Sequence, residues 1–265
     1  MGRGIVASRP QAVELVHQGR VLVSGAIADK PARLVSPAEP IELVGERPPF
    51  VSRGGRKLEA ALTRFDINPK GQRALDAGAS TGGFTDCLLQ AGATRVFAVD
   101  VGHGQLHERL RADARVVNLE RTDIRDVTVA TTEGAPVDLV VADLSFMSAT
   151  RAVPVLVGPV AHRDVPVVLL VKPQFEAGRV EVSKGRGVIR DPELHLKALV
   201  EVATALEAAG AVIMGAMPSP ITGHSGNIEF LVYARTPGRQ AASFQHAEVV
   251  AAAAVTEAHA SIGQG

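Results

Sequence analysis

Four ionisable residues that lie far apart in the sequence could together bind a hydroxyl group and either take up its proton or stabilise the alkoxide that forms. They are Lys57, Asp143, Lys172 and Glu229. Asp143 and Lys172 each end an otherwise apolar segment, V-V-A-D-L-S-F and V-V-L-L-V-K-P. Such segments are typical of central strands, whose carboxyl ends face the crevice of an α/β sheet. A buried Lys172–Asp143 ion pair with a structural role is the alternative, but a lysine ending a central strand favours function.

A second group of residues could bind a small polar ligand. The segment D-A-G-A-S-T-G-G-F, residues 76–84, lies where the first strand of the expected sheet turns into a helix. Its glycines allow the backbone to approach a ligand closely. The segment is not the dinucleotide fingerprint, because Ser80 stands where G-x-G-x-x-G needs glycine. It is not a phosphate-binding P-loop either, because no lysine follows the glycines.

The acidic residues around this segment indicate which ligand it takes. Asp76 suits the cationic amino-acid part of a ligand, and Asp100, at the end of the next strand, is placed to accept from ribose hydroxyls. Asp123 could hold an adenine amine, with Glu120 as its rival. Together they predict an S-adenosylmethionine pocket, and an ordinary glycine turn with capping acids is the alternative. The predicted contacts are Asp76, Gly78, Ser80, Thr81, Gly82, Gly83, Phe84, Asp100 and Asp123.

Charge is balanced over the chain but not along it. The 265 residues carry 28 basic and 28 acidic side chains, which argues against adhesion of the whole protein to nucleic acid. In residues 1–57, however, basic residues outnumber acidic ones, so we expect a polyanion to bind to this part of the chain. The predicted phosphate contacts are Arg3, Arg9 and Arg20, with Arg53 and Arg56 beside the site. For any single arginine, a solvated helix face is an equally good interpretation.

Several other classes of protein are disfavoured. A lone cysteine, Cys87, cannot form an internal disulfide, so we expect a reducing cytoplasm. The longest uncharged run, Ala208–Ile228, contains two prolines and is not a membrane span. His103 and His107 have helical spacing but no evident third ligand, so no metal site is expected. Nothing in the sequence indicates the oligomeric state.

The elements that must position these residues alternate along the chain. A first helix begins at the capping residue Ser8 and ends at Gly19, and Ser52 is expected to cap another. Strands without a polar face, separated by helices, predict a mostly parallel sheet covered on both sides, with the last two strands an antiparallel edge pair. We expect strands at 20–27, 41–44, 73–78, 95–101, 116–120, 138–144, 165–173, 211–217 and 227–235, and helices at 84–91, 104–112, 148–160 and 192–209.

Six motifs occur in one order over residues 4–236: S-R-G-G-R-K-L, D-A-G-A-S-T-G-G-F, V-D-V-G-H-G-Q-L, V-A-D-L-S-F, V-K-P-Q-F-E and S-G-N-I-E-F. In these the chain resembles the TlyA-type (haemolysin A) family of FtsJ-like ribosomal RNA 2′-O-methyltransferases. The resemblance implies a Rossmann-like, seven-stranded α/β domain and S-adenosyl-L-methionine as methyl donor. It also implies cytidine riboses of ribosomal RNA, in the small or large subunit, as acceptors. The family's Lys-Asp-Lys-Glu tetrad falls on Lys57, Asp143, Lys172 and Glu229.

Residues 3–25 resemble a small α+β RNA-binding module shared with a small-subunit ribosomal protein. The family pattern has a further R-L-D-x-x-L-V segment before the R-G, whereas this chain starts Met1-Gly2-Arg3-Gly4. Either translation begins upstream, or the module lacks its first helix. We therefore expect an RNA-binding module at 1–45, a linker at 46–51, a methyltransferase domain at 52–236 and a partly helical tail at 237–265.

Lys172 is the predicted partner of the ribose hydroxyl. A neutral amine would take the proton and a charged one would stabilise the alkoxide, and the sequence leaves both open. Asp143 would orient Lys172, while Glu229 and Lys57 would hold the ribose. Phe146 and Phe175 adjoin these motifs and are expected to pack rather than to stack on bases. Three other functions remain open: methylation of another RNA or a small molecule, a membrane-active haemolysin, and an inactive RNA-binding protein.

Overall fold

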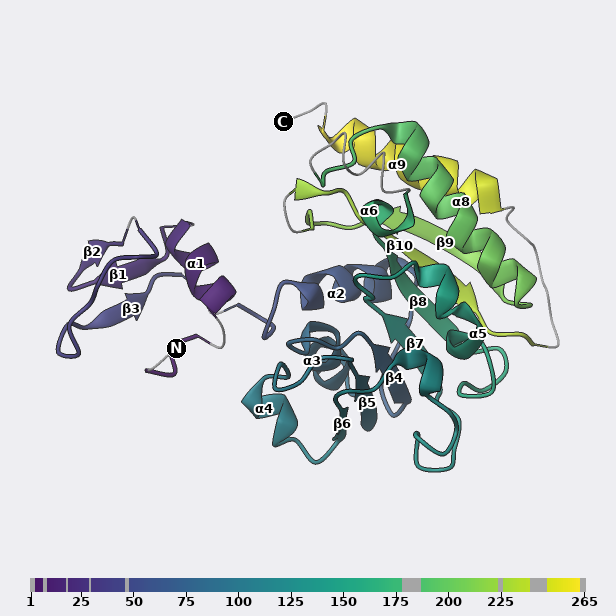
Figure 1. Ribbon diagram of the computed structural model, residues 1–265, viewed down its shortest axis with the longest axis horizontal. Coiled ribbons are helices and arrows are strands. Elements are labelled where there is room, and N and C mark those ends of the chain that lie inside the picture. Colours follow the sequence, from purple (N-terminus) through teal and green to yellow (C-terminus); the bar gives the residue numbers. More distant parts are fainter. Residues whose placement is uncertain are drawn as a thin grey trace. The chain divides into compact units, whose positions relative to one another are not determined.

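The computed structural model describes residues 3–6, 9–17, 19–28, 30–45, 48–177, 187–223, 226–238 and 247–262. They form two compact units, Met1–Ser52 and Arg53–Gly265. Both units, with their helices and strands labelled, are drawn in Figure 1.

The first unit pairs one helix with a small antiparallel sheet. Helix α1 (Arg9–His17) is followed by β1 (Val21–Val23), β2 (Ala26–Ile27) and β3 (Ile41–Leu43), in the sheet order β2-β1-β3. The predicted strand 20–27 is thus a hairpin of two short strands, because Ser24 and Gly25 both adopt positive φ and turn the chain. Gly19, with φ +66°, follows the helix as predicted. Ser8, the predicted cap, lies outside the described residues.

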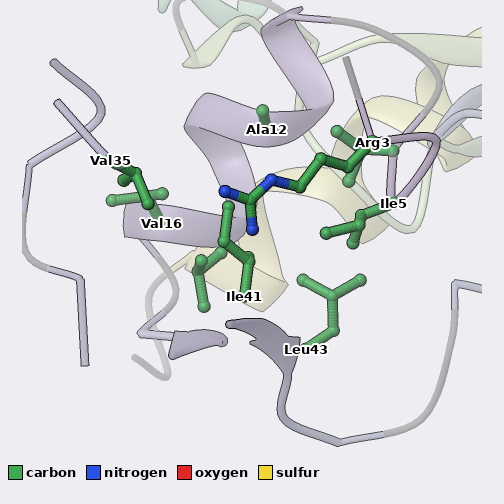
Figure 2. Close-up of a pocket in the computed structure, with 9 residues that line it drawn as sticks. Arg3, Ile5, Ala12, Val16, Val35, Ile41 and Leu43 are labelled. Atoms are coloured by element: carbon green, nitrogen blue, oxygen red, sulfur yellow. The ribbon is translucent and has the colours of Figure 1, made fainter. Parts of the chain in front are cut away.

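An apolar pocket of about 310 Å³ lies in this unit (Figure 2). The Arg3 side chain extends across it, and the guanidinium donates to the carbonyl oxygens of Ser36, at 2.6 Å, and Glu39. Arg3, a predicted phosphate contact, therefore makes its hydrogen bonds within its own unit. The pocket is lined by Arg3, Ile5, Val6, Ala12, Val16, Val21, Val35, Ile41 and Leu43.

The second unit is built on a seven-stranded sheet in the order β6-β5-β4-β7-β8-β10-β9. Strands β4 to β8 are parallel, and β10 runs antiparallel to both β8 and β9. The predicted antiparallel pair is present at one edge of the sheet, where β9 is the edge strand and β10 lies between β8 and β9. The strands are β4 (Arg73–Ala77), β5 (Arg95–Val99), β6 (Val116–Leu119), β7 (Leu139–Ala142), β8 (Pro166–Val171), β9 (Val212–Pro218) and β10 (Phe230–Arg235).

Helices pack on both faces of this sheet (Figure 1). Helices α8 and α9 pack on each other and on β9, whereas α2 contacts α3 and β10, and α3 contacts β4 and β5. Alternate strand residues such as Leu75, Phe97 and Leu169 share one core with α5, α8 and α9. The helices are α2 (Gly54–Arg64), α3 (Gly83–Gln90), α4 (Glu108–Arg111), α5 (Val153–Leu156), α6 (Pro173–Glu176), α8 (Pro192–Ala208) and α9 (Ala247–Ile262), with the 3₁₀ turns η1 (Ile124–Asp126) and η2 (Ala149–Arg151).

Three predicted helix boundaries were wrong. The helix expected at 104–112 is only the single turn α4, because Gly104 has positive φ and the His107 side chain caps Arg109. The helix expected at 148–160 is divided into η2 and α5, because Pro154 lacks an N–H and therefore sits in the first turn of α5. Arg53, not Ser52, occupies the N-cap position of α2.

Candidate active site

The sheet order reverses at β4, since β5 lies on one side of it and β7 on the other. In open α/β sheets, ligands bind outside the carboxyl ends of the strands at such a switch point. The glycine-rich segment follows β4, Asp100 follows β5, Asp143 follows β7 and Lys172 follows β8. The predicted residues therefore collect at one edge of the sheet.

Lys172 and Asp143 form a close ion pair. The Lys172 amine lies 2.5 Å from Asp143 Oδ1 and donates to Ser145 Oγ at 2.7 Å. It also lies 5.7 Å from the centre of the Phe175 ring. Lys172 is buried, because five preceding residues of β8 are buried and the chain turns directly into α6.

Lys57 and Glu229 form a second buried ion pair, between α2 and the start of β10. Phe230 pairs with Val171 across β10 and β8, so Glu229 and Lys172 are the next residues beyond this antiparallel pair. The backbone of Gly223 lies against the Glu229 carboxylate, since an added Cβ would come within 2.0 Å of Oε1. The register of β8 and β10 thus places the Lys57–Glu229 pair next to the Lys172–Asp143 pair along the sheet.

Asp76 is completely buried in β4. Its Oδ2 accepts a 2.6 Å hydrogen bond from the Thr85 hydroxyl of α3, whereas Oδ1 makes no hydrogen bond with any described residue. Burial raises the pKa of Asp76 to about 7, and the nearby Asp143 adds to this effect. A buried carboxylate oxygen without a partner indicates a place where a cationic ligand group can bind.

The glycine loop passes close to the Lys172–Asp143 pair. Gly78 has φ +83°, and a Cβ there would lie 2.5 Å from the carbonyl oxygen of Asp143. Gly82 has φ +95°, and a Cβ there would collide with Leu110. Only glycine fits both positions, so the loop follows a path that larger residues would block. Ser80, Thr81, Gly83 and Phe84 complete this loop and the start of α3, where Phe84 is buried.

The acids after β5 and β6 already hold backbone and side-chain partners. Asp100 accepts from the backbone N–H groups of Ser80, at 2.8 Å, and Gly102, at 2.7 Å, which leaves further lone pairs toward the crevice. Asp123 caps η1 and pairs with Arg125 at 2.5 Å, and hydrogen bonds from Arg125 lower its pKa to about 2.

Glu120, the rival of Asp123, holds the loop after β5. A Glu120 oxygen lies 2.8 Å from His103 Nδ1. The pKa of Glu120 is lowered to about 2, mainly by a hydrogen bond from the Gly104 backbone and further by hydrogen bonds from neighbouring side chains. The structure thus gives both acids local partners, and a contact of either with an adenine stays a prediction.

The arginines predicted to contact phosphates differ in their exposure and in their hydrogen bonds. Arg9, Arg53 and Arg56 are exposed. Within the described part of the chain, the side chains of Arg53 and Arg56 make no hydrogen bond or ion pair. Arg20, in contrast, donates from Nε to the carbonyl oxygen of Val44 at 3.0 Å.

Four residues at this edge were missed or misjudged from the sequence. Ser145 contacts Lys172, and Glu176 binds the turn that follows β7. Val101, directly after Asp100, is 69% exposed. Phe146 was expected to pack, but it is 94% exposed and its ring contact is with Phe175, at 5.8 Å between ring centres. Their only signal in the sequence is that they lie within the motifs.

Comparison with known proteins bears on this arrangement directly. The pattern of FtsJ-like methyltransferases matches residues 50–236, and that of the S4 domain matches residues 3–41. The chain belongs to the FtsJ-like methyltransferase family. The predicted family and the mostly parallel, seven-stranded fold are thereby confirmed, together with the small N-terminal domain.

Relatives of this FtsJ-like chain span nearly its whole length. The 16S/23S rRNA (cytidine-2′-O)-methyltransferase TlyA of Mycobacterium tuberculosis is 47% identical, covering 96% of this chain and 94% of that protein. Hemolysin A of Brachyspira hyodysenteriae is 40% identical over 87% of this chain and 95% of that protein. A solved structure from Streptococcus thermophilus, described as a candidate haemolysin, has a TM-score of 0.79 and 35% identity over 99% of this chain and 94% of that one.

Two features of the described residues concern a membrane-active protein and a metal site. In the described ranges, no helix is long and apolar enough to cross a membrane. No group of three or more potential metal ligands was found among the residues that the structure describes.

Proposed function

We propose that this FtsJ-like methyltransferase transfers a methyl group from S-adenosylmethionine to the 2′-oxygen of a cytidine in ribosomal RNA. The observation that carries the proposal is the placement of the two ion pairs, Lys172–Asp143 and Lys57–Glu229, at neighbouring positions of β8 and β10, with Gly78 of the glycine loop against Asp143. Methylation of cytidine in ribosomal RNA is the activity named for the mycobacterial relative. That this chain is a haemolysin is not favoured, since no described helix has the length and apolarity of a membrane span.

The residues around the switch point fit the methyl donor. The unpaired Oδ1 of Asp76 suits the ammonium of an amino-acid group, and the closely packed Gly78 lets that group approach the backbone. Asp100 has lone pairs left for ribose hydroxyls, and the exposed Val101 offers an apolar surface to the base. When bound, S-adenosylmethionine supplies an electrophilic methyl group on a sulfonium.

The four ionisable residues would hold the acceptor. The Lys172 amine would lie against the 2′-oxygen. There it would bind the hydroxyl and either take up its proton or stabilise the alkoxide. Asp143 fixes the direction of that amine. Glu229, one residue beyond the β8–β10 pairing, and its partner Lys57 of α2 would orient the ribose. The exposed ring of Phe146 offers a stacking surface for the target base.

The S4 domain and the arginines of α2 would bring the RNA to the site. Arg53 and Arg56 lie within a turn of Lys57, so phosphates bound there would be close to the acceptor ribose. Arg9 on α1 would add a contact from the S4 domain. We expect the protein to bind this RNA as part of a ribosomal subunit.

Methyl transfer with and without the Lys172 amine tests the proposal. Radiolabelled S-adenosylmethionine is incubated with purified unmethylated small subunits, large subunits or intact ribosomes. For Lys172→Ala we expect normal donor binding and loss of transfer by about a hundredfold or more. Lys197→Ala, an exposed lysine of α8, is the matched control and should leave transfer unchanged. Retention of more than about a tenth of activity would remove Lys172 from the central role.

A further inference from the structure

The turn between β7 and η2 surrounds the Lys172 amine more closely than the tetrad alone requires. The amine contacts Asp143 at the start of this turn and Ser145 two residues later. The Phe175 ring also lies near the amine. Because a lysine side chain has four rotatable bonds, a single ion pair does not fix its end. Ser145 supplies a second point of attachment.

The same turn contains a strained residue. Phe146 has φ +67°, a left-handed conformation that bulky residues rarely adopt, and its ring is 94% exposed. This conformation turns the ring outward directly after Ser145. Backbone strain of this kind costs about 1–3 kcal/mol and persists only where the surroundings hold it in place. Some contact must therefore hold residues 143–148.

Glu176 provides that contact. Its Oε2 accepts from the Ser148 hydroxyl at 2.5 Å, and its Oε1 accepts from the Ala149 backbone N–H at 2.8 Å. Glu176 ends the single turn α6 that begins directly after Lys172. Its carboxylate thus joins the segment after β8 to the segment after β7. The Glu176 side chain is partly buried, and this burial raises the pKa of its carboxyl group.

We propose that Ser145 and Glu176 are positioning residues that hold the Lys172 amine in place for methyl transfer. Ser145 acts on the amine directly, and Glu176 acts through the turn that carries Ser145. This inference rests on the proposed function, because it assigns both residues to the reaction for which Lys172 is the central group.

Kinetics of four variants of the full chain test the proposal. They are Ser145→Ala, Ser145→Thr, Glu176→Gln and the control Glu207→Gln, an exposed residue of α8. For Ser145→Ala and Glu176→Gln we expect kcat to fall by about tenfold or more, because small displacements of reacting groups are costly. KM and the affinity for S-adenosylmethionine should stay within about twofold of wild type. Ser145→Thr retains the hydroxyl and should restore most of kcat, and Glu207→Gln should behave as wild type.

A second measurement does not depend on turnover. Chemical labelling of lysine amines, read by mass spectrometry, should rise several-fold at Lys172 in Ser145→Ala and Glu176→Gln while Lys57 is unchanged. Unchanged kcat and unchanged labelling would overturn the proposal, as would a loss of donor affinity that parallels the loss of kcat. Wild-type protein that methylates no ribosomal RNA would contradict the proposed function instead, and the labelling of Lys172 would then decide the positioning role alone.

Discussion

Among single residues, Asp76 combines a burial cost with a proposed binding role. Its pKa is raised from 3.8 to about 7 by burial, so the folded protein holds this proton more tightly than the unfolded chain. The contribution to stability is complete below pH 4 and is lost as the pH rises through 7. Because a tenfold change in proton affinity corresponds to about 1.4 kcal/mol, the loss reaches at most about 4 kcal/mol in the ligand-free protein.

Asp76→Asn should therefore stabilise the ligand-free protein at pH 8 and change little at pH 4, because the amide carries no charge to bury. Donor affinity should fall about ten- to a hundredfold, since a charge-assisted hydrogen bond to the ligand ammonium is lost. Denaturant unfolding at both pH values and calorimetric titration with S-adenosylmethionine measure the two effects. Asp126→Asn, an exposed acid of η1, is the control. An Asn variant that binds the donor as tightly as wild type would show that Asp76 does not face the ammonium.

At the scale of elements, the sequence predicted what periodicity and strand-end chemistry determine. The strands before Asp143 and Lys172 were predicted because their apolar runs end in a charge. The antiparallel pairing of β9 and β10 was predicted because no helix separates them. Register and turn geometry carry no such signal. The contact of Ser145 with Lys172 and the left-handed φ of the next residue, Phe146, belong to a turn that nothing in the spacing of the residues indicates.

Helix α9 shows how a distant element can be fixed by a buried polar contact. His259 Nε2 lies 3.0 Å from Nδ1 of the fully buried His195 of α8, whose Nε2 lies 3.2 Å from the Ile189 carbonyl oxygen. The carbonyl can only accept, so His195 donates to Ile189 and accepts from His259. Burial lowers the pKa of His195, so the folded protein favours the neutral ring. The contribution of neutral His195 to the free energy of unfolding is therefore complete above pH 6.5 and is lost as the pH falls through the lowered pKa.

We therefore expect His259→Leu to lower the free energy of unfolding by about 1–3 kcal/mol at pH 8, because it leaves the His195 acceptor buried and unpaired. The protection of α9 amides from hydrogen exchange, relative to the intrinsic rate at the same pH, should fall, and the wild-type helix should lose protection as the pH falls below 6.5 through the lowered pKa of His195. His259→Gln keeps a donor and should lose less. Thr256→Ala, whose hydroxyl bonds only its own helix at Ala252, serves as control. Equal exchange in all four proteins would rule out the histidine pair as the anchor of α9.

Over the whole molecule, the charges cancel, yet the basic excess lies in the part that carries the S4 domain and the first turn of α2. The structure divides the arginines of this part into two kinds. Arg3 and Arg20 donate to backbone carbonyls of their own unit, whereas Arg53 and Arg56 are exposed. Only the second kind can lose its charge without loss of an observed hydrogen bond.

The double variant Arg53→Gln and Arg56→Gln should therefore weaken RNA binding at every sequence to a similar degree. Each lost phosphate contact should reduce the slope of log affinity against log salt by about 0.7–0.9, so the pair should reduce it by about 1.5. Fluorescence titration of labelled ribosomal RNA over a range of salt concentrations measures the slope. Donor affinity should not change. Arg163→Gln, an exposed arginine before β8 at the opposite end of the strands, should leave the slope as it is. If the double variant keeps the wild-type slope, phosphates do not reach α2, and the S4 domain must guide the RNA by contacts that do not depend on these charges.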